Sequence, residues 1–305
     1  MQGFLFKICA WILLGLGLHA WAGTKAGGTT DEYYLRFTTP KQHALILGGS
    51  RASRGLHPDV LDSALTRSGL EGPLYNFSFT IDHSPYGQTY LTAIRAKLDP
   101  RTVNGLFILE VSPWLLVQPK SADSVVAFPE AQRLLGEQWF FNMRPNYEYL
   151  IRHRTRGWGS LLRTRPGWAA VRSDGRLFVR WETETERATQ TAARIEEYRD
   201  DRSLNMDYSL ERERTLADLI NELKPHGRVV LVRLPCVKAL KTYDDMVCPD
   251  FLERMNALAI RTNSEFIDLM PLDGRVHYVD GSHLDDRSGV WVSRALADSI
   301  LARLP

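Results

Sequence analysis

Cysteine is scarce in this sequence of 305 residues, which contains only three. Cys9 lies in an apolar stretch at the N-terminus, and the other two are Cys236 and Cys248. Their spacing offers no second Cys or His pair, so the sequence does not predict a structural zinc site. Two alternatives stay open for this pair: a disulfide formed in an oxidising compartment, or two unpaired buried thiols.

The chain also has little net charge. The chain has 38 Lys and Arg against 36 Asp and Glu, a formal net charge of +2. So small a charge does not predict nucleic acid as a partner. Hydrophobic residues make up 44% and charged residues 24% of the chain, close to the globular average. These values exclude collagen-like, coiled-coil and largely disordered proteins, and we find no internal repeat.

The N-terminus carries the one long apolar run. Lys7 is the only charged residue among the first 22, the run extends from Ile8 to Leu18, and Ala20-Trp21-Ala22 resembles a signal peptidase site. This pattern predicts a signal peptide at 1–22 and an exported protein: periplasmic, cell-envelope associated or extracellular. An uncleaved anchor that keeps the chain at a membrane, or a buried helix, are the alternatives. We expect residues 23–42 to form a polar linker.

Short apolar runs alternate with segments of helical spacing in the remainder of the chain. The runs that predict buried strands are 43–47, 74–79, 105–111, 228–234 and 265–269. The segments that predict helices are 58–65, 85–98, 249–261 and 288–304. This alternation predicts a single α/β domain over 43–305, a three-layer sandwich with a mostly parallel sheet covered on both faces.

The alternation disappears over about 115–225, where we predict a mostly helical insertion. Residues 144–180 contain nine Arg and no Lys, interleaved with aromatic residues, whereas 181–215 carry ten acids and six Arg. Three interpretations of the basic aromatic stretch stay open. The first is a solvated surface paired with the acidic stretch. The second is a lid or groove for a polyanionic or sugar polymer, and the third is a surface for anionic lipid headgroups.

Two motifs at opposite ends of the chain carry candidate chemistry. Ser50 follows the first apolar run and the Gly48-Gly49 turn, at the carboxyl end of a strand, where ligands bind in open α/β sheets. Asp280 and His283 are three residues apart before the last helix, a spacing that lets the carboxylate orient the imidazole. We predict acyl transfer with Ser50 as nucleophile, His283 as general base and Asp280 as orienting acid.

These motifs resemble those of the SGNH/GDSL hydrolases. The matching stretches are Gly-Gly-Ser-Arg-Ala-Ser at 48–53 and Asp-Gly-Ser-His-Leu at 280–284, and Tyr-Asn-Phe-Ser-Phe at 75–79 is similar to the family's second block. The details look more like divergent cell-envelope members, relatives of polysaccharide O-acyltransferases and D-alanyl-transfer proteins, than like secreted lipases. The resemblance implies a flavodoxin-like fold and an ester hydrolase or acyltransferase without metal or organic cofactor.

Two positions differ from the family pattern. Gly49 stands where the family has Asp, and Glu-Val-Ser-Pro-Trp at 110–114 replaces the Gly-x-Asn-Asp block whose Asn completes the oxyanion hole. We therefore expect Gly49, Asn76 and Ser78 to line the oxyanion site, with Asn76 or Ser78 supplying a donor in place of the missing Asn. Arg51 either binds an anionic substrate beside Ser50 or pairs with an acid.

Two functions follow from these observations. The first is an exported serine ester hydrolase or O-acyltransferase acting on acyl esters of an envelope or extracellular polysaccharide, with an acylated carbohydrate or other ester as its partner. The second is a catalytically degenerate protein that keeps the fold and binds a glycan or assists envelope assembly. The missing Asp and Asn motivate the second function.

Overall fold

The computed structural model describes residues 2–120, 134–153, 161, 169–179, 183–199 and 206–304. The chain divides into two compact units, a smaller one of residues 1–40, 138–173 and 177–179, and a larger one of residues 41–137, 174–176 and 180–305. We expected one domain preceded by a linker. Instead, the first 40 residues form a unit with part of the predicted insertion.

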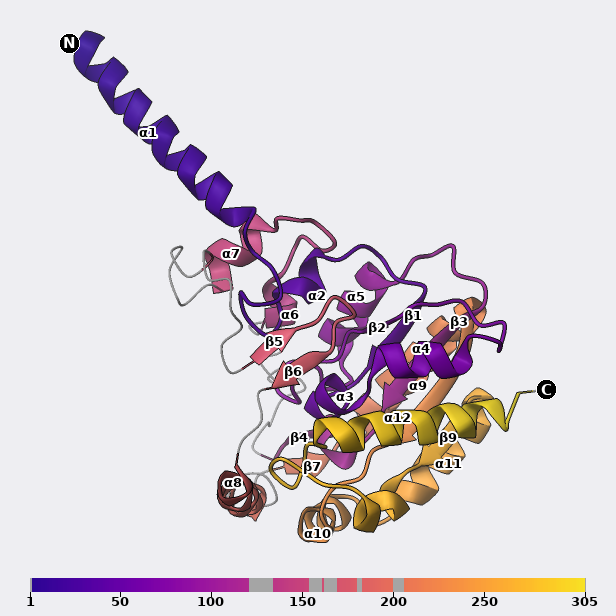
Figure 1. The fold of residues 1–305 in the computed structure, drawn as a ribbon. Helices are drawn as coiled ribbons and strands as arrows, with labels where there is room; N and C mark the ends of the chain where they lie inside the picture. The colour runs from indigo at the N-terminus through magenta and orange to yellow at the C-terminus, as the bar shows by residue number, and fades with distance from the viewer. Residues whose placement is uncertain are drawn as a thin grey trace. The chain divides into compact units, whose positions relative to one another are not determined.

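A five-stranded parallel sheet forms the centre of the larger unit. Its strands are β1 (Ala44–Leu47), β2 (Leu74–Asn76), β3 (Gly105–Glu110), β8 (Gly227–Arg233) and β9 (Glu265–Asp268). Their order is β2-β1-β3-β8-β9, and every neighbouring pair is parallel. Figure 1 labels β1, β2, β3 and β9 among them. Each strand coincides with an apolar run predicted as one, which confirms the α/β fold class.

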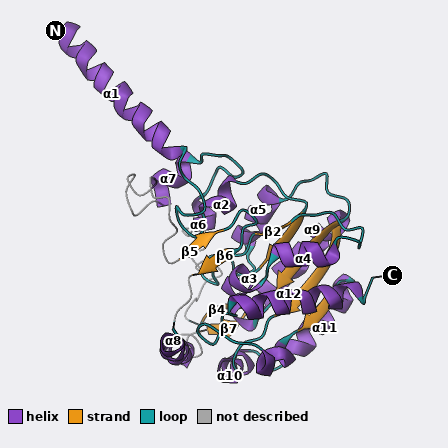
Figure 2. Cartoon of the chain, in the orientation of Figure 1, coloured by secondary structure: helices purple, strands orange, loops and turns teal. Residues whose placement is uncertain are grey.

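Helices cover both faces of this sheet (Figure 2). Ile46, Ile108 and Val232 form a buried cluster with residues of α4 (Pro58–Leu65) and α12 (Asp286–Leu301). On the other face α9 contacts β8, α11 contacts β9 and α5 packs beside α9; these helices are α5 (Gln88–Lys97), α9 (Leu210–Leu223) and α11 (Phe251–Thr262). Because both faces are covered, the strands are continuous apolar runs rather than alternating ones.

Local sequence features explain where several of these helices begin and end. α4 begins with Pro58. Proline has no backbone N–H, and this costs nothing in the first turn of a helix, where an N–H has no partner within the helix. α12 is capped by Asp285, whose carboxylate accepts the Ser288 N–H at 2.7 Å. α11 ends at Asn263, which adopts the left-handed conformation with φ +48°.

The predicted insertion contains short strands that the sequence did not indicate. Two antiparallel pairs form there, β4 (Val117–Pro119) with β7 (Met206–Tyr208) and β5 (Ala169–Val171) with β6 (Leu177–Val179). Helices in the described part of the insertion include α6 (Leu134–Glu137), α7 (Tyr147–His153) and α8 (Glu184–Glu197). The insertion also ends earlier than expected, because α9 contacts β8 and α11 as part of the core. Trp158 and Trp168 of the basic aromatic stretch lie outside the described residues.

The smaller unit contains an aromatic cluster where we expected a polar linker. Tyr34 and Phe37 of α2 (Tyr34–Thr38) are fully buried. Their rings lie 5.5 and 5.2 Å from the ring of Tyr149 in α7. Residues 23–42 are therefore not a linker, because ring burial of this kind stabilises a packed unit.

The same unit begins with α1 (Gln2–Gly23), a helix long and apolar enough to cross a membrane. A signal sequence near an N-terminus has the same length and composition, so the helix is compatible with either prediction.

The turn after β1 requires a glycine. Gly48 has φ +134°, and a Cβ there would lie 2.7 Å from Cβ of Glu110. We expect Gly48→Ala to lower the free energy of unfolding by about 1–3 kcal/mol, measured by urea denaturation. Both the unfavourable backbone conformation and the overlap with Glu110 contribute to this loss. Gly274→Ala is the control, since Gly274 has open space around it. Equal effects of the two substitutions would contradict this account.

Candidate functional site

Ser50 begins α3 (Ser50–Gly55) directly after the turn that ends β1. The turn is held by side chains from the segment that follows β2. The Gly48 carbonyl accepts a hydrogen bond from the Ser84 hydroxyl at 2.8 Å, and the Gly48 N–H donates to the Tyr90 hydroxyl at 3.0 Å. These bonds place Ser50 at the carboxyl edge of the sheet, as predicted.

Glu110, the last residue of β3, holds the same turn from the other side. It is almost fully buried, and its Oε2 accepts the Gly49 N–H at 2.7 Å. Burial raises the pKa of Glu110, against the opposing effects of Arg51, the Gly49 N–H and the Ser112 hydroxyl. We did not predict this residue from the sequence. An acid that ends an otherwise apolar strand is the feature that could have indicated it, because buried acids need partners.

The turn before α12 brings Asp280 and His283 to Ser50. His283 Nε2 lies 2.8 Å from Ser50 Oγ, and His283 Nδ1 lies 2.8 Å from Asp280 Oδ2. Asp280 Oδ1 accepts the N–H of Ser282 at 3.1 Å and the N–H of His283 at 2.9 Å. Asp280 and His283 are buried and Ser50 is half-buried. The structure therefore brings the three residues together in the order that nucleophilic catalysis requires.

Arg194 of α8 adds a fourth side chain to this arrangement. Its Nη2 donates to Asp280 Oδ2 at 3.0 Å, and its Nη1 donates to Glu197 at 2.6 Å. Arg194 and Asp280 are 86 residues apart in the chain. No local pattern could therefore have indicated the contact, and only the position of α8 creates it.

Electrostatics keep Asp280 charged and His283 neutral at pH 7. Burial opposes the ionisation of Asp280, but His283, its hydrogen bonds and Arg194 outweigh burial and hold the pKa of Asp280 well below its usual value. Burial, and then the positive charge of Arg54, lower the pKa of His283 to about 4 against the opposing effect of Asp280. Neutral His283 can accept the Ser50 proton at Nε2.

Asn76 and Ser78 do not supply the expected oxyanion donor. Asn76 is fully buried, and its Nδ2 donates to the carbonyls of Ala52 and Leu56 at 2.9 and 3.3 Å. The Ser78 hydroxyl donates to the Ile46 carbonyl at 3.3 Å. Both side chains bond to backbone groups around β1 and α3, because buried polar groups take the nearest acceptors. This prediction was wrong for both residues.

Gly49 is also not an open donor, because its N–H bonds to Glu110. The Ser50 N–H remains. It lies in the first turn of α3, where an N–H has no intrahelical partner, and we find no acceptor for it among the described residues. One backbone donor is therefore available beside the Ser50 hydroxyl.

Arg51 pairs with an acid, which was one of the two interpretations left open. It is buried, its Nη1 lies 3.8 Å from Asp244 Oδ2, and its Nε donates to Ser282 Oγ at 3.4 Å. Asp244 is fully buried and also accepts hydrogen bonds from Arg233 at 3.0 Å and from Trp114 Nε1 at 2.7 Å. Arg51 therefore belongs to a buried charge network rather than to an exposed binding surface.

Cys236 and Cys248 are free thiols, so the disulfide prediction was wrong. Cys236 packs in an apolar cluster with Trp114 and Leu240, and burial raises the pKa of its thiol to about 11. Cys248 lies 3.4 Å from Asp250 Oδ1, and burial raises the pKa of its thiol to about 12. The two thiols therefore lie in different environments, which agrees with the alternative of two unpaired buried thiols.

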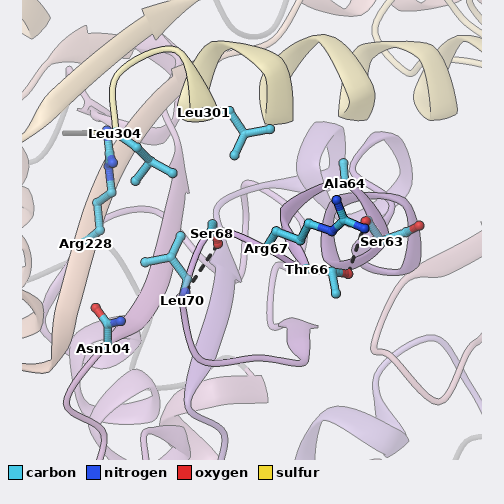
Figure 3. A pocket seen from close by; sticks show the side chains of 10 residues that line it. All are labelled: Ser63, Ala64, Thr66, Arg67, Ser68, Leu70, Asn104, Arg228, Leu301 and Leu304. Carbon is cyan, nitrogen blue, oxygen red and sulfur yellow. Dashed lines mark hydrogen bonds between the residues drawn. The ribbon is translucent and has the colours of Figure 1, made fainter.

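Ser50, Asp280 and His283 do not line the cavity of about 770 Å³ whose lining residues Figure 3 shows. Its lining includes Asn104 just before β3, Arg228 at the start of β8 and Leu301 at the end of α12. These positions mark the amino edge of the sheet, opposite the edge that carries Ser50, and no residue predicted for chemistry lines the cavity. Among the described residues we find no group of three or more His, Cys, Asp or Glu that could hold a metal ion.

Comparison with known proteins gives loose structural likenesses. No protein-family model and no curated protein matches the chain. The crystal structure of the lipase/acylhydrolase from Enterococcus faecalis is similar at 12% identity, covering 86% of this chain and 97% of that chain with a TM-score of 0.38. A superposition this loose shows nothing about activity.

The charge of Arg194 adds to the effects of burial and of Arg54 that lower the pKa of His283. We expect Arg194→Gln to move the pKa of His283 upward from about 4, because removing a nearby positive charge favours the imidazolium. Titration of the His283 ring by NMR measures this shift without any substrate. Arg199→Gln is the matched control, because Arg199 extends from the end of the same helix and pairs with exposed Glu196. An unchanged midpoint in Arg194→Gln would refute the assignment.

Proposed function

We propose that this protein is an exported serine ester hydrolase or O-acyltransferase of the SGNH type. The observation that carries the proposal is the hydrogen-bonded chain from Ser50 Oγ through His283 to Asp280, with 2.8 Å at each step. A neutral imidazole between a hydroxyl and a buried carboxylate can remove a proton and keep the resulting positive charge stabilised.

The reaction follows from these positions. As Ser50 Oγ attacks the ester carbonyl, His283 Nε2 takes the hydroxyl proton and Asp280 stabilises the imidazolium. The tetrahedral intermediate expels the alcohol, which receives that proton from His283 and leaves an acyl-Ser50 ester. Water or a sugar hydroxyl then attacks this ester while His283 again accepts the proton, and the Ser50 hydroxyl is restored. Attack by water gives hydrolysis, and attack by a sugar gives acyl transfer.

The oxyanion site sets the expected rate. The Ser50 N–H is the one donor that we find open, whereas Gly49, Asn76 and Ser78 are already bonded. Loss of one oxyanion donor costs about 100–1,000-fold in rate in serine hydrolases. We therefore expect slower turnover than in an enzyme with a complete oxyanion hole.

The substrate class rests on the N-terminus and on the resemblance in sequence. α1 is compatible with a signal sequence or an anchor, and either would bring the larger unit outside the cytoplasm. The motifs around Ser50 and His283 resemble those of cell-envelope acyl-transfer proteins. An acylated polysaccharide of the envelope or the extracellular space is therefore the proposed substrate.

The alternative function is a binding protein that keeps the fold without the chemistry. The occupied Asn76 and Ser78 side chains favour it, because they leave the oxyanion site with few donors. The alignment of Ser50, His283 and Asp280 favours catalysis, because a buried and desolvated His-Asp pair is costly to maintain where it has no role.

A serine-reactive probe separates the two functions. We expect a fluorophosphonate to label the wild-type chain at Ser50, and Ser50→Ala to reduce hydrolysis of a nitrophenyl acetate ester by at least about 1,000-fold. The matched control is Ser63→Ala, which removes the hydroxyl of an exposed serine in α4 and should change neither reading. Absence of labelling together with equal ester hydrolysis by wild type and Ser50→Ala would favour the binding function.

The pH dependence follows from the lowered pKa of His283. Below its pKa the ring is protonated and cannot accept the Ser50 proton, so the rate falls as the pH decreases through about 4. The probe labelling rate should therefore remain nearly constant between pH 8 and pH 5.5 and lose half its value near pH 4. A midpoint near the ordinary histidine value of about 6.5 would show that His283 is not held as described.

A further inference from the structure

An exposed apolar surface lies on the smaller unit. Its members are Trp139, Phe140, Met143 and Ile151. The exposed fractions of these residues are 75, 51, 42 and 73%, in that order. We call these four residues the apolar patch. Soluble proteins rarely leave large apolar groups gathered at the surface, and such groups mark contacts with a partner or a membrane.

Contacts with α7 hold three members of the apolar patch, Trp139, Phe140 and Ile151, near one another. The Glu148 carboxylate accepts the N–H of Trp139 at 3.2 Å and that of Phe140 at 2.9 Å. The Arg152 guanidinium lies 4.8 Å from the centre of the Trp139 ring and pairs with Glu148 at 3.3 Å. Ile151 is the neighbour of Arg152 in α7, so the segment that carries Trp139 and Phe140 is folded against the helix that carries Ile151.

The same helix contacts the C-terminal end of α1 (Figure 1). Tyr147, four residues before Ile151 and therefore on the same side of α7, donates its hydroxyl to the Ala20 carbonyl at 2.8 Å. The Tyr147 ring also packs beside Gly23, where an added Cβ would overlap the ring in its present position. The apolar patch therefore begins where α1 ends.

α1 itself has the dimensions of a membrane span. Its 22 residues correspond to about 33 Å of helix, slightly more than the hydrocarbon core of a bilayer at about 30 Å. At its C-terminal end the Lys25 ammonium lies 5.5 Å from the centre of the exposed Trp21 ring. Trp and Lys are the residues that commonly lie at the junction of hydrocarbon and headgroups.

We propose that α1 is retained as a membrane anchor and that the apolar patch rests in the headgroup region of the same bilayer. Retention is favoured because cleavage after Ala22 would remove the Ala20 carbonyl that Tyr147 bonds and would leave a charged terminus at Gly23 beside the Tyr147 ring. With α1 in the bilayer, the patch lies at the depth where Trp and other amphipathic side chains gain most by partial burial. A lipid surface therefore covers the patch without a protein partner.

Spin labels test the position of the apolar patch. The full chain, with Cys9→Ser, carries a nitroxide at Ile151→Cys or at the matched control Ile260→Cys, which replaces an isoleucine 82% exposed on the larger unit. Cys236 and Cys248 are buried, so they are poor targets for the label. In nanodiscs of phosphatidylethanolamine and phosphatidylglycerol, we expect the label at 151 to collide more with oxygen than with a water-soluble nickel chelate, and the label at 260 to show the reverse.

Three outcomes would overturn this proposal. A label at 151 that collides more with the nickel chelate than with oxygen in nanodiscs, as expected at 260, would show that the apolar patch faces water. Protection at 151 in cell membranes but not in nanodiscs would identify a protein as the occupant. An intact mass showing that the chain produced in bacteria begins at Gly23 would show that α1 is cleaved. None of these measurements involves ester chemistry, so they decide the membrane proposal whatever the result for Ser50.

Discussion

The close approach of α12 to α3 is the constraint on which the candidate site depends. An added Cβ at Gly289 would lie 2.9 Å from the Gly55 carbonyl, and one at Gly55 would lie 3.2 Å from the Leu284 side chain. Small residues at this contact let the turn before α12 reach the turn after β1. The hydrogen bond from the Ser50 hydroxyl to His283 spans 233 residues of sequence and exists only because these two helices pack so closely.

A group of buried charges surrounds the site. Glu110 holds the Gly49 N–H, and Asp244 joins Arg51 of α3 to Arg233 of β8. Burying charges is costly, and replacing them with apolar residues of similar size is often neutral or stabilising. Their effect here is geometric, because each bond fixes the position of a backbone segment next to Ser50. Removing one partner would leave an uncompensated charge in the core.

Arg194 connects the insertion to the chemistry of the core. Helix α8 is itself well formed, with a capping box between Thr183 and Glu186 at its start, and this positions Arg194 near its end. The charge of Arg194 stabilises ionised Asp280 and disfavours protonated His283. The insertion therefore acts on the electrostatics of the site, an effect separate from any contact with substrate.

The amino-acid pattern was enough to predict the core of this protein. Strand positions, their parallel arrangement and the meeting of Ser50, Asp280 and His283 could be predicted, because apolar periodicity and short motifs depend on neighbours along the chain. The remaining contacts depend on how distant segments pack together. Asn76 was expected at the oxyanion site but bonds to backbone carbonyls, and Arg194 could not be foreseen, because partners of buried polar groups are set by whichever distant segment folds against them.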